Sequence, residues 1–270
     1  MKYKSIISLK NPTIKEILKI KERRYKDKDK LFLIEGIHLI EMALDSSFEI
    51  KMVFFSESFK NKTEGQRLLR KLIKRNTELI QISDEINIRL SDTESPQGVL
   101  ALLSFKTYRL QDIQFKGNSF IVVCDGIQDP GNLGTIIRAS DAACVDAVVI
   151  LPNTCDVFMH KTLRATAGSI FNIPIVHSDL ESLLEYLRLR GITLYSTDIR
   201  AERLIYETDF NKPIAIAFGN EARGVSETLR KMSDLIKIPI IGKAESLNVA
   251  MAASVCLYEI VRQRMYKMNY

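Results

Sequence analysis

Four runs of apolar residues in the second half of the chain limit what this half can fold into. Each run is nearly continuous in Val, Ile, Leu, Ala and Phe rather than alternating, which is typical of strands buried on both faces of a sheet. The runs are SFIVVCDG (119–126), DAVVILP (146–152), ITLYSTD (192–198) and PIAIAFGN (213–220). Helices are expected near residues 132–143, 159–169, 179–190 and 224–231. The pattern predicts a mostly parallel α/β sheet covered by helices.

The first part of the chain forms a second, separate α/β series. Short runs rich in β-branched and aromatic residues, LFLIEG, IKMVFFSE, LIQIS and GVLALLS, alternate with helical stretches such as EGQRLLRKLIKRN. The intervening KTYRLQDIQFKGNS is polar and has no sustained periodicity. We therefore predict two domains, residues 1–105 and 118–270, joined by a linker over 106–117. A chain of 270 residues with 46% hydrophobic content can give each domain its own core.

Positive charge is concentrated at the amino end of the chain. Residues 1–30 contain eleven Lys or Arg and four Asp or Glu, a net charge of +7, while the whole chain carries +6. Such a concentration is typical of a face that binds a polyanion, because each phosphate neutralised by Lys or Arg releases condensed counterions. A solvated helix surface would carry the same charge without a partner, so both interpretations stand.

Several classes of function lack their sequence signals. No stretch approaches 18 consecutive apolar residues, and the amino end lacks the apolar core of a signal peptide, so we expect a cytoplasmic protein with no membrane segment. The four cysteines form no C-x-x-C pair and the three histidines have no metal-ligand spacing, so neither disulfides nor a metal site is expected. The absence of G-x-G-x-x-G, P-loop and G-x-S-x-G patterns argues against dinucleotide binding, P-loop nucleotide binding and acyl hydrolysis.

Three glycine-marked segments follow strands of the predicted sheet, at the edge where parallel α/β sheets bind ligands. They are DPGNLGTIIRAS (129–140), FGNEARGVS (218–226) and IPIIGKAESLNVAMAASVCLYEIVRQR (238–264). Each segment alone is equally consistent with a tight turn or a helix cap. The third continues into a helix that is apolar on several faces, and such a helix is expected to be buried on all sides.

Together these segments resemble motifs 1, 2 and 3 of the SpoU (TrmH-like) branch of the SPOUT RNA methyltransferases, in the same order and at similar spacings. The segment NPTIKEILKIKERRYKDKDKLFLIEGIHLIEMAL and the later SPQGVLALL are similar to the L30e-like substrate-binding domain that precedes the catalytic domain in many members. The resemblance covers nearly the whole chain. Three motifs in order, each at a strand-to-loop junction, make coincidence improbable.

The resemblance implies an L30e-like α/β domain followed by a SPOUT α/β-knot domain, in which the carboxyl-terminal segment is threaded through a loop as a deep trefoil knot. Knots are otherwise nearly absent from proteins. Family members bind S-adenosylmethionine in the knot, mainly through backbone groups, and transfer its methyl group to a ribose 2′-hydroxyl of RNA. The resemblance also implies a homodimer, in which a partner subunit covers the apolar helix.

Site residues follow from the same resemblance. Arg138 matches the catalytic arginine of motif 1, which the family is usually described as using as a base. A guanidinium has a pKa above about 12, so the alternative is that Arg138 fixes a phosphate and stabilises the oxyanion. The polar set around it is Asn132, Glu221, Ser246 and Asn248; the cofactor set is Thr197, Gly219, Asn220, Ile238 and Leu247; the RNA-binding set is Lys21, Arg23, Arg24, Lys161 and Arg164.

Two other functions stay open at this point. A non-catalytic RNA-binding dimer would use the basic first domain alone, although the intact polar set argues against it. An adenine-nucleotide-binding enzyme on an open sheet would need the phosphate loop that the chain lacks. Under the methyltransferase hypothesis, the separate L30e-like domain favours ribosomal RNA over transfer RNA as the substrate.

Overall fold

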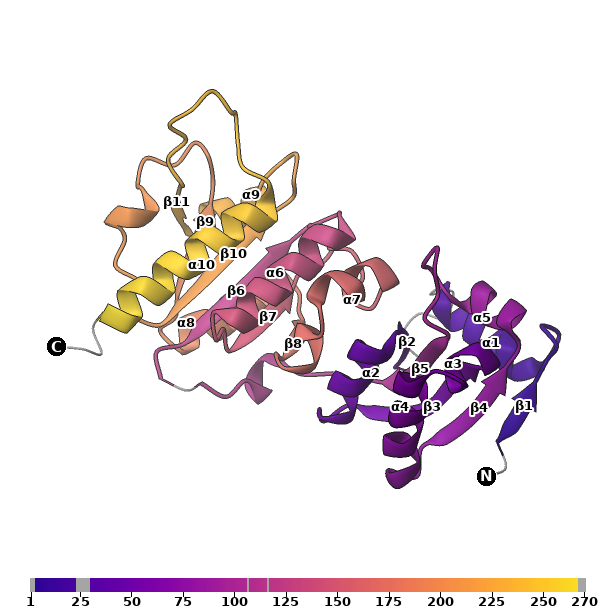
Figure 1. The fold of residues 1–270 in the computed structure, drawn as a ribbon. Coiled ribbons are helices and arrows are strands. Elements are labelled where there is room, and N and C mark those ends of the chain that lie inside the picture. The colour runs from indigo at the N-terminus through magenta and orange to yellow at the C-terminus, as the bar shows by residue number, and fades with distance from the viewer. Residues whose placement is uncertain (1–2, 23–29, 106, 116, 267–270) are drawn as a thin grey trace. The chain divides into compact units, whose positions relative to one another are not determined.

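The chain forms two compact units (Figure 1). The computed structural model describes residues 3–22, 30–105, 107–115 and 117–266. The N-terminal unit contains Met1–Lys106 and Phe158–Leu163, and the C-terminal unit contains Thr107–Val157 and Arg164–Tyr270. The boundaries of the two domains and of the linker over residues 106–117 stay a prediction.

A mixed five-stranded sheet forms the N-terminal unit, in the order β1-β4-β3-β5-β2. β4 runs parallel to β1 and β3, whereas β5 is antiparallel to β3 and β2. The strands are β1 (Lys4–Ile6), β2 (Leu31–Glu35), β3 (Glu49–Ser56), β4 (Glu78–Ile82) and β5 (Val99–Ser104); the helices are α1 (Pro12–Lys21), α2 (Ile37–Leu44), α3 (Glu57–Lys60), α4 (Thr63–Lys74) and α5 (Asp84–Leu90). The predicted α/β character is confirmed, while β1 and α5 are elements that the sequence pattern did not predict.

Helix α1 shows how the basic amino end folds. The side chain of Asn11 accepts a hydrogen bond from the N–H of Thr13 at 2.9 Å, and Pro12 occupies the first turn, where its missing N–H costs nothing. Ile14, Ile17 and Ile20 recur at helical spacing and are buried in the core against the sheet. Lys15 and Lys19 therefore lie on the exposed side of the helix.

An all-parallel six-stranded sheet forms the C-terminal unit, in the order β11-β9-β10-β6-β7-β8. The strands are β6 (Phe120–Asp125), β7 (Ala147–Ile150), β8 (Ile175–His177), β9 (Thr193–Thr197), β10 (Ile214–Gly219) and β11 (Asp234–Ile236); the helices are α6 (Pro130–Ala142), α8 (Leu180–Leu189), α9 (Glu227–Lys231) and α10 (Val249–Tyr266). Helix α7 (His160–Thr166) begins in the segment assigned to the N-terminal unit and ends in the C-terminal unit. Three short 3-10 turns, η1 (Leu110–Asp112), η2 (Ser169–Phe171) and η3 (Ile205–Glu207), complete the elements. All four predicted apolar runs are strands of this sheet, which confirms the fold class.

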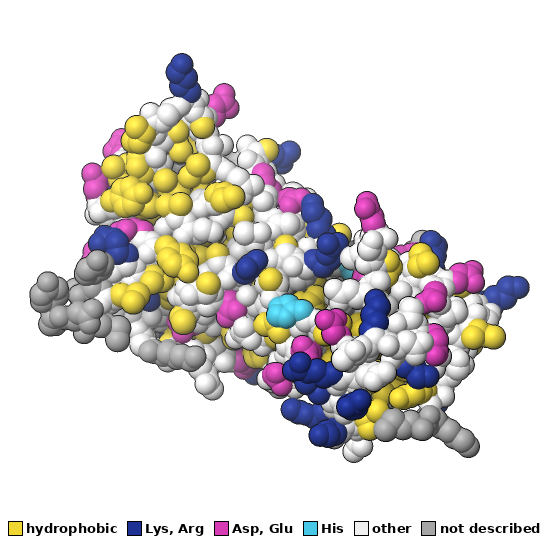
Figure 2. Space-filling view, viewed as in Figure 1, with side chains coloured by type: hydrophobic (Ala, Val, Ile, Leu, Met, Phe, Trp, Pro, Cys, Tyr) yellow, Lys and Arg dark blue, Asp and Glu magenta, His cyan; other side chains and the backbone are white. Residues whose placement is uncertain are grey.

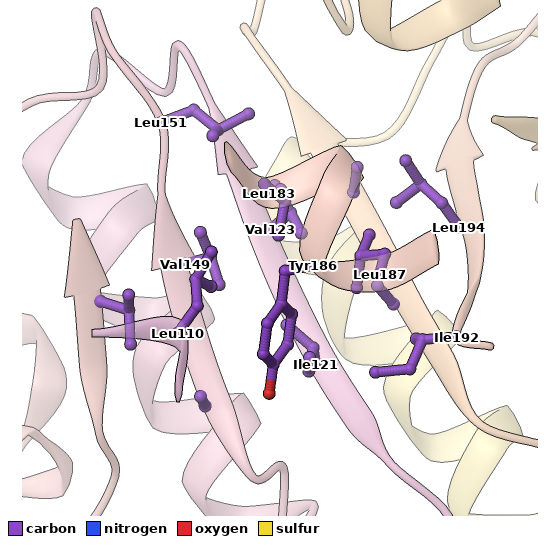
Figure 3. Close-up of a cluster of buried hydrophobic side chains, with 14 of the residues drawn as sticks. Leu110, Ile121, Val123, Val149, Leu151, Leu183, Tyr186, Leu187, Ile192 and Leu194 are labelled. Carbon is purple, nitrogen blue, oxygen red and sulfur yellow. The ribbon is translucent and has the colours of Figure 1, made fainter. Parts of the chain in front are cut away.

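The core on one face of this sheet explains why its strands are continuously apolar. Figure 3 shows Tyr186, Leu183 and Leu187 of α8 pointing toward Ile121 and Val123 of β6. Helices α6 and α10 lie along the sheet beside each other (Figure 1) and pack together. Because helices occupy both faces, inward and outward positions of β6 are equally apolar.

The central pair of strands places two of the three glycine-marked segments side by side. β6 and β10 are neighbours in parallel register, with Gly219 opposite Asp125 at their carboxyl ends. The segment after β6 becomes α6, and the segment after β10 becomes the loop before α9. The sheet topology therefore brings together residues nearly a hundred positions apart in the sequence.

Arg264 holds helix α10 to the end of the sheet at which β6 and β10 begin. Its guanidinium donates hydrogen bonds to the carbonyl oxygens of Phe210, Asn118, Ser119 and Lys212 at 2.9 to 3.2 Å. These carbonyls lie just before β6 and β10, where the strands begin.

In the described ranges no helix combines the length and apolarity needed to cross a bilayer. The cytoplasmic location stays a prediction.

We expect Arg264→Met to lower the free energy of unfolding by about 3 kcal/mol, because four backbone carbonyls lose a charged donor. Urea unfolding followed by circular dichroism measures this loss. Arg188→Met on α8 is the matched control, because Arg188 is exposed and its side chain pairs with no other described residue. Equal stability of the two variants would show that the Arg264 hydrogen bonds do not hold α10.

Candidate active site

Polar side chains tie the carboxyl ends of the two central strands together. Asp125, the last residue of β6, accepts a hydrogen bond from the N–H of Ser226 at 2.6 Å. Asn220 follows β10 directly, and its Nδ2 donates to the carbonyl of Gly126 at 2.9 Å. The Oδ1 of Asn220 accepts two N–H groups of its own loop. The loop after β10 is thus fastened to the start of the segment that leads into α6.

The carboxylate of Glu221 forms the centre of a hydrogen-bond network. It accepts the backbone N–H groups of Gln128 and Asp129, each at 3.1 Å, and the Nδ2 of Asn132 at 3.0 Å. Asp129 in turn caps α6 by accepting the N–H of Asn132 at 2.9 Å. Asn132 therefore caps nothing itself; its side chain is held by the second segment.

Asn132 links this network to the third segment. Its Oδ1 accepts a hydrogen bond from the Nδ2 of Asn248 at 3.0 Å. The Oδ1 of Asn248 accepts the N–H groups of Ala250 and Met251, so Asn248 caps the first turn of α10. The structure thus connects Glu221, Asn132 and Asn248, one residue from each of the three segments, in a single chain of hydrogen bonds.

The network keeps Glu221 ionised. Partial burial raises its pKa, but the hydrogen bonds from Asn132, Asp129 and Gln128 outweigh burial and leave the pKa below its ordinary value. A carboxylate can only accept hydrogen bonds, so it also fixes the orientation of the Asn132 amide. Glu221 and Asn248 remain exposed, which leaves the network open to a ligand from solvent.

Gly219 owes its identity to its own loop. A Cβ at this position would lie 2.1 Å from the carbonyl carbon of Gly224 and 2.1 Å from the nitrogen of Val225. Those atoms belong to the tight turn in which Asn220 and Gly224 exchange backbone hydrogen bonds. The backbone that approaches this glycine closely is therefore the protein's own, and its place in the cofactor set stays a prediction.

The loop between β11 and α10 carries main-chain groups with no hydrogen-bond partner among the described residues. Across residues 238–247, all of which the structure describes, no backbone N–H or C=O forms a hydrogen bond with another described residue. Ile238 is half-buried, Leu247 is 41% exposed, and the hydroxyl of Ser246 is exposed without a hydrogen bond among the described residues. A loop of this kind can bind a ligand through main-chain groups.

Arg138 lies on α6, beyond the residues of the network. Its side chain is exposed and makes no hydrogen bond or ion pair with any residue in the described ranges. Thr197 ends β9, the neighbour of β10, and its hydroxyl donates to the carbonyl of Ala217 at 3.2 Å. The arginine is therefore available to an external partner, whereas the threonine hydroxyl is already used within the sheet.

Asp198, the residue after β9, is a buried group that the sequence did not single out. Its carboxylate accepts hydrogen bonds from Arg200 and, at 2.8 Å, from Arg230 of α9. Hydrogen bonds from Arg200 hold the pKa of Asp198 at about 2, against the opposing effect of burial. Arg230 also donates to the carbonyl of Val225 at 3.4 Å. The ion pair of Asp198 and Arg230 thus stabilises the loop after β10, which contains Val225.

The predicted RNA-binding residues differ in their surroundings. Lys21 is no free surface charge: its Nζ lies 2.8 Å from a carboxylate oxygen of Asp92 and donates to two backbone carbonyls, and its side chain is 14% exposed. Arg23 and Arg24 lie outside the described residues. Lys161 and Arg164 are exposed on α7.

Among the described residues no three His, Cys, Asp or Glu side chains gather as a metal site.

We expect Glu221→Gln to destabilise the protein by about 1 kcal/mol at neutral pH, a modest value because solvent screens a partly exposed carboxylate. The folded-state pKa of Glu221 lies below its ordinary value of 4.5. Its contribution is therefore complete above that pH and is lost as the pH falls through the lowered pKa.

Urea unfolding at several pH values between about 3 and 7 tests this expectation. The difference between wild type and Glu221→Gln should shrink as the pH falls. Glu185→Gln on the exposed side of α8 is the matched control. A constant difference across the pH range would contradict a role for the ionised carboxylate.

Comparison with protein families agrees with this arrangement. Residues 119–258 match the model of the SpoU rRNA Methylase family, and residues 11–101 match that of the MRM3-like substrate binding domain. The first match covers the first two glycine-marked segments completely and the third as far as the middle of α10. The second match lies within the N-terminal unit.

Individual relatives match over nearly the whole chain. The 23S rRNA (guanosine(2553)-2′-O)-methyltransferase RlmP of Bacillus subtilis is 33% identical over 95% of this chain and 99% of its own. The AdoMet-bound rRNA methyltransferase of Sinorhizobium meliloti is 30% identical, with a TM-score of 0.86 over 96% of this chain and 98% of its own. The SpoU methyltransferase AviRb of Streptomyces viridochromogenes in complex with AdoMet is 28% identical, with a TM-score of 0.87 over 95% and 99%. The chain therefore belongs to the SpoU rRNA methylase family.

Proposed function

We propose that this protein transfers a methyl group from S-adenosylmethionine to a ribose 2′-hydroxyl of ribosomal RNA. The observation that carries the proposal is the chain of hydrogen bonds that joins Glu221, Asn132 and Asn248 beside the unpaired main chain of residues 238–247. Relatives that match over the full length are named as 23S rRNA 2′-O-methyltransferases or rRNA methyltransferases. Two solved relatives of this length contain AdoMet.

The residues present fit S-adenosylmethionine. The cofactor set comprises Thr197, Gly219, Asn220, Ile238 and Leu247, which lie at or after the ends of β9, β10 and β11. Main-chain groups of the loop over 238–247 can bind the adenine and the amino acid part, and Leu247 can pack on the base. When bound, the cofactor would supply an electrophilic methyl group and leave as S-adenosylhomocysteine, and the 2′-hydroxyl that accepts the methyl group would release its proton to solvent.

Arg138 acts on the RNA rather than on the cofactor. Its guanidinium is exposed and has no partner among the described residues, so it can bind a phosphate next to the target ribose. There it stabilises the negative charge that develops on the 2′-oxygen. Glu221, Ser246, Asn132 and Asn248 form the polar surface on which the ribose lies. The network itself fixes this surface before substrate arrives.

The N-terminal unit supports ribosomal RNA as the substrate. The full-length relatives carry a matching N-terminal region and are named for rRNA. Residues 1–105 accordingly serve as the L30e-like RNA-binding domain and residues 118–270 as the knotted methyltransferase domain. A non-catalytic RNA-binding dimer would not need the intact hydrogen-bond network, which favours the enzyme.

An exposed apolar stripe on α10 supports a homodimer. Met251, Val255 and Tyr258 recur at helical spacing and are 64%, 38% and 55% exposed. Figure 2 shows hydrophobic side chains along this helix on the surface of the C-terminal unit. In the single chain this face of α10 is exposed, as expected if the partner subunit covers it. A second copy of the chain would cover this face.

We expect Leu247→Ala to weaken S-adenosylmethionine binding about tenfold, because the removed side-chain atoms no longer bury apolar surface against the cofactor. Isothermal titration calorimetry measures the affinity. Leu189→Ala removes an equally large exposed side chain at the end of α8 and should leave the affinity unchanged. Unchanged affinity in Leu247→Ala would contradict the position of the cofactor.

We expect Arg138→Ala to reduce methyl transfer to RNA at least about 100-fold with unchanged cofactor affinity, as for a group that stabilises the transition state. Thr135→Ala, on the exposed side of the same helix, serves as the control. Incorporation of labelled methyl groups into RNA from a strain lacking the protein gives the rate. Normal activity of Arg138→Ala would remove this residue from the site.

Co-expression tests whether the arginine serves its own subunit or the partner's. A heterodimer of Arg138→Ala with Leu247→Asp contains one intact composite site if the arginine acts across the interface, and activity then recovers in part. Both sites are defective if Arg138 serves its own subunit. Background activity in verified heterodimers would thus reject the shared site, and an active monomer in light scattering would reject the dimer.

A further inference from the structure

The outer face of α4 is the most uniformly charged helix surface in the N-terminal unit. The helix spans Thr63–Lys74 and buries Leu68, Leu69 and Leu72 against the sheet. Its exposed side carries Arg67, Arg70, Lys71 and Lys74, and Arg75 follows directly at the helix end. The only acidic residue within the helix is Glu64 in the first turn. Figure 2 shows dark blue side chains gathered over the region in which Figure 1 places this helix.

Most of these charges form no ion pair with a described residue. The hydrogen bond from Lys71 lowers the pKa of the Glu41 carboxyl group, and Arg67 lies near enough to lower it further. Lys71 pairs with Glu41 at 2.5 Å, whereas Arg67, Arg70, Lys74 and Arg75 form no ion pair or side-chain hydrogen bond with any described residue. Arg70 and Lys74, and likewise Lys71 and Arg75, are four positions apart and therefore neighbours on the helix. Like charges at this spacing destabilise a helix, so the pattern is unfavourable unless an anion binds there.

The amphipathic helix α8 does not share this pattern. Its exposed side places Glu181 and Glu185 before Arg188, so charges of both signs occur there. A surface that serves only solubility needs no single sign of charge. The charge of α4 therefore indicates a polyanionic partner.

We propose that the outer face of α4 binds the phosphate backbone of the RNA substrate. The proposal rests on the proposed function, which makes RNA the polyanion that the enzyme must bind. Arg67 and Arg75 are eight residues apart, or about 12 Å along the helix axis, which spans a few phosphates of one strand. Arginine forks match phosphate oxygens, and three of the four unpaired residues are arginines.

The surroundings of α4 disfavour an acidic protein as the partner. Among the described residues, none of the large apolar side chains that are exposed belongs to α4. Protein interfaces are built around buried aromatic or aliphatic anchors, and this surface has none. Sequence-independent binding to a phosphate backbone needs no such anchor.

The test compares the double variant Arg70→Gln/Lys74→Gln with the matched variant Arg188→Gln/Lys212→Gln, which removes the same charge from the C-terminal unit. Both variants are full-length chains. Affinity for ribosomal RNA is measured by filter binding at several salt concentrations, and methyl transfer is measured at saturating RNA. Thermal unfolding is recorded for both, and the α4 variant should be no less stable than wild type because it loses like-charge repulsion.

We expect the α4 variant to bind RNA about tenfold more weakly near physiological salt and to lower the slope of log affinity against log salt by about 1.5. Its rate at saturating RNA should match wild type, and the control variant should match wild type throughout. Unchanged affinity and slope in a folded α4 variant would overturn the proposal. A loss of binding to polyglutamate without loss of RNA binding would overturn it in favour of an acidic protein.

The binding data and the activity data separate the two proposals. If wild type binds RNA but transfers no methyl group, the proposed function fails, while the salt slope of the α4 variant still decides the role of this surface. If wild type methylates RNA and the α4 variant binds normally, the proposed function stands and the α4 surface is rejected.

Discussion

One carboxylate, that of Glu221, holds the candidate active site in its shape. By accepting two backbone N–H groups at the start of α6, it satisfies donors that would otherwise have no partner at a helix end. By accepting the amide of Asn132, it turns the oxygen of that amide toward Asn248 and so toward α10. The position of three segments therefore depends on one ionised group on a loop. The Asp198–Arg230 pair supports this loop from its other side.

The two units differ in the charge of the surfaces proposed to bind RNA. The N-terminal unit carries three arginines and one lysine without an ion pair among the described residues on α4 and at its end, whereas the polar network of the C-terminal unit consists of carboxylates, neutral amides and main-chain groups. In the proposed function, long-range attraction of RNA and short-range positioning of a ribose therefore depend on different residues. Substitutions on the two surfaces are expected to change affinity and rate separately.

Much of the fold followed from the sequence because buried parallel strands leave an unmistakable apolar run. β8 and β11 are not among the four predicted apolar runs because each has only three residues, and Asp234–Ile236 begins with an acidic residue. Asn132, Glu221 and Asn248 were identified only through the family resemblance, since no spacing rule relates residues so far apart. Asp198 was missed because its partners Arg200 and Arg230 become neighbours only in the folded sheet. Gly219 was identified through the resemblance, but the sequence does not show the close approach of the Gly224 and Val225 backbone that leaves no room for a Cβ at this position.

The long sequence separation within the network has a consequence for how the protein folds. Glu221 lies 89 positions after Asn132, and Asn248 lies 116 positions after it. Contacts between such distant residues close large loops. The loss of chain entropy on loop closure makes such contacts slow to form. Contact order therefore predicts that the β6–α6 region folds with its polar side chains facing water and that α10 docks on it in a later step.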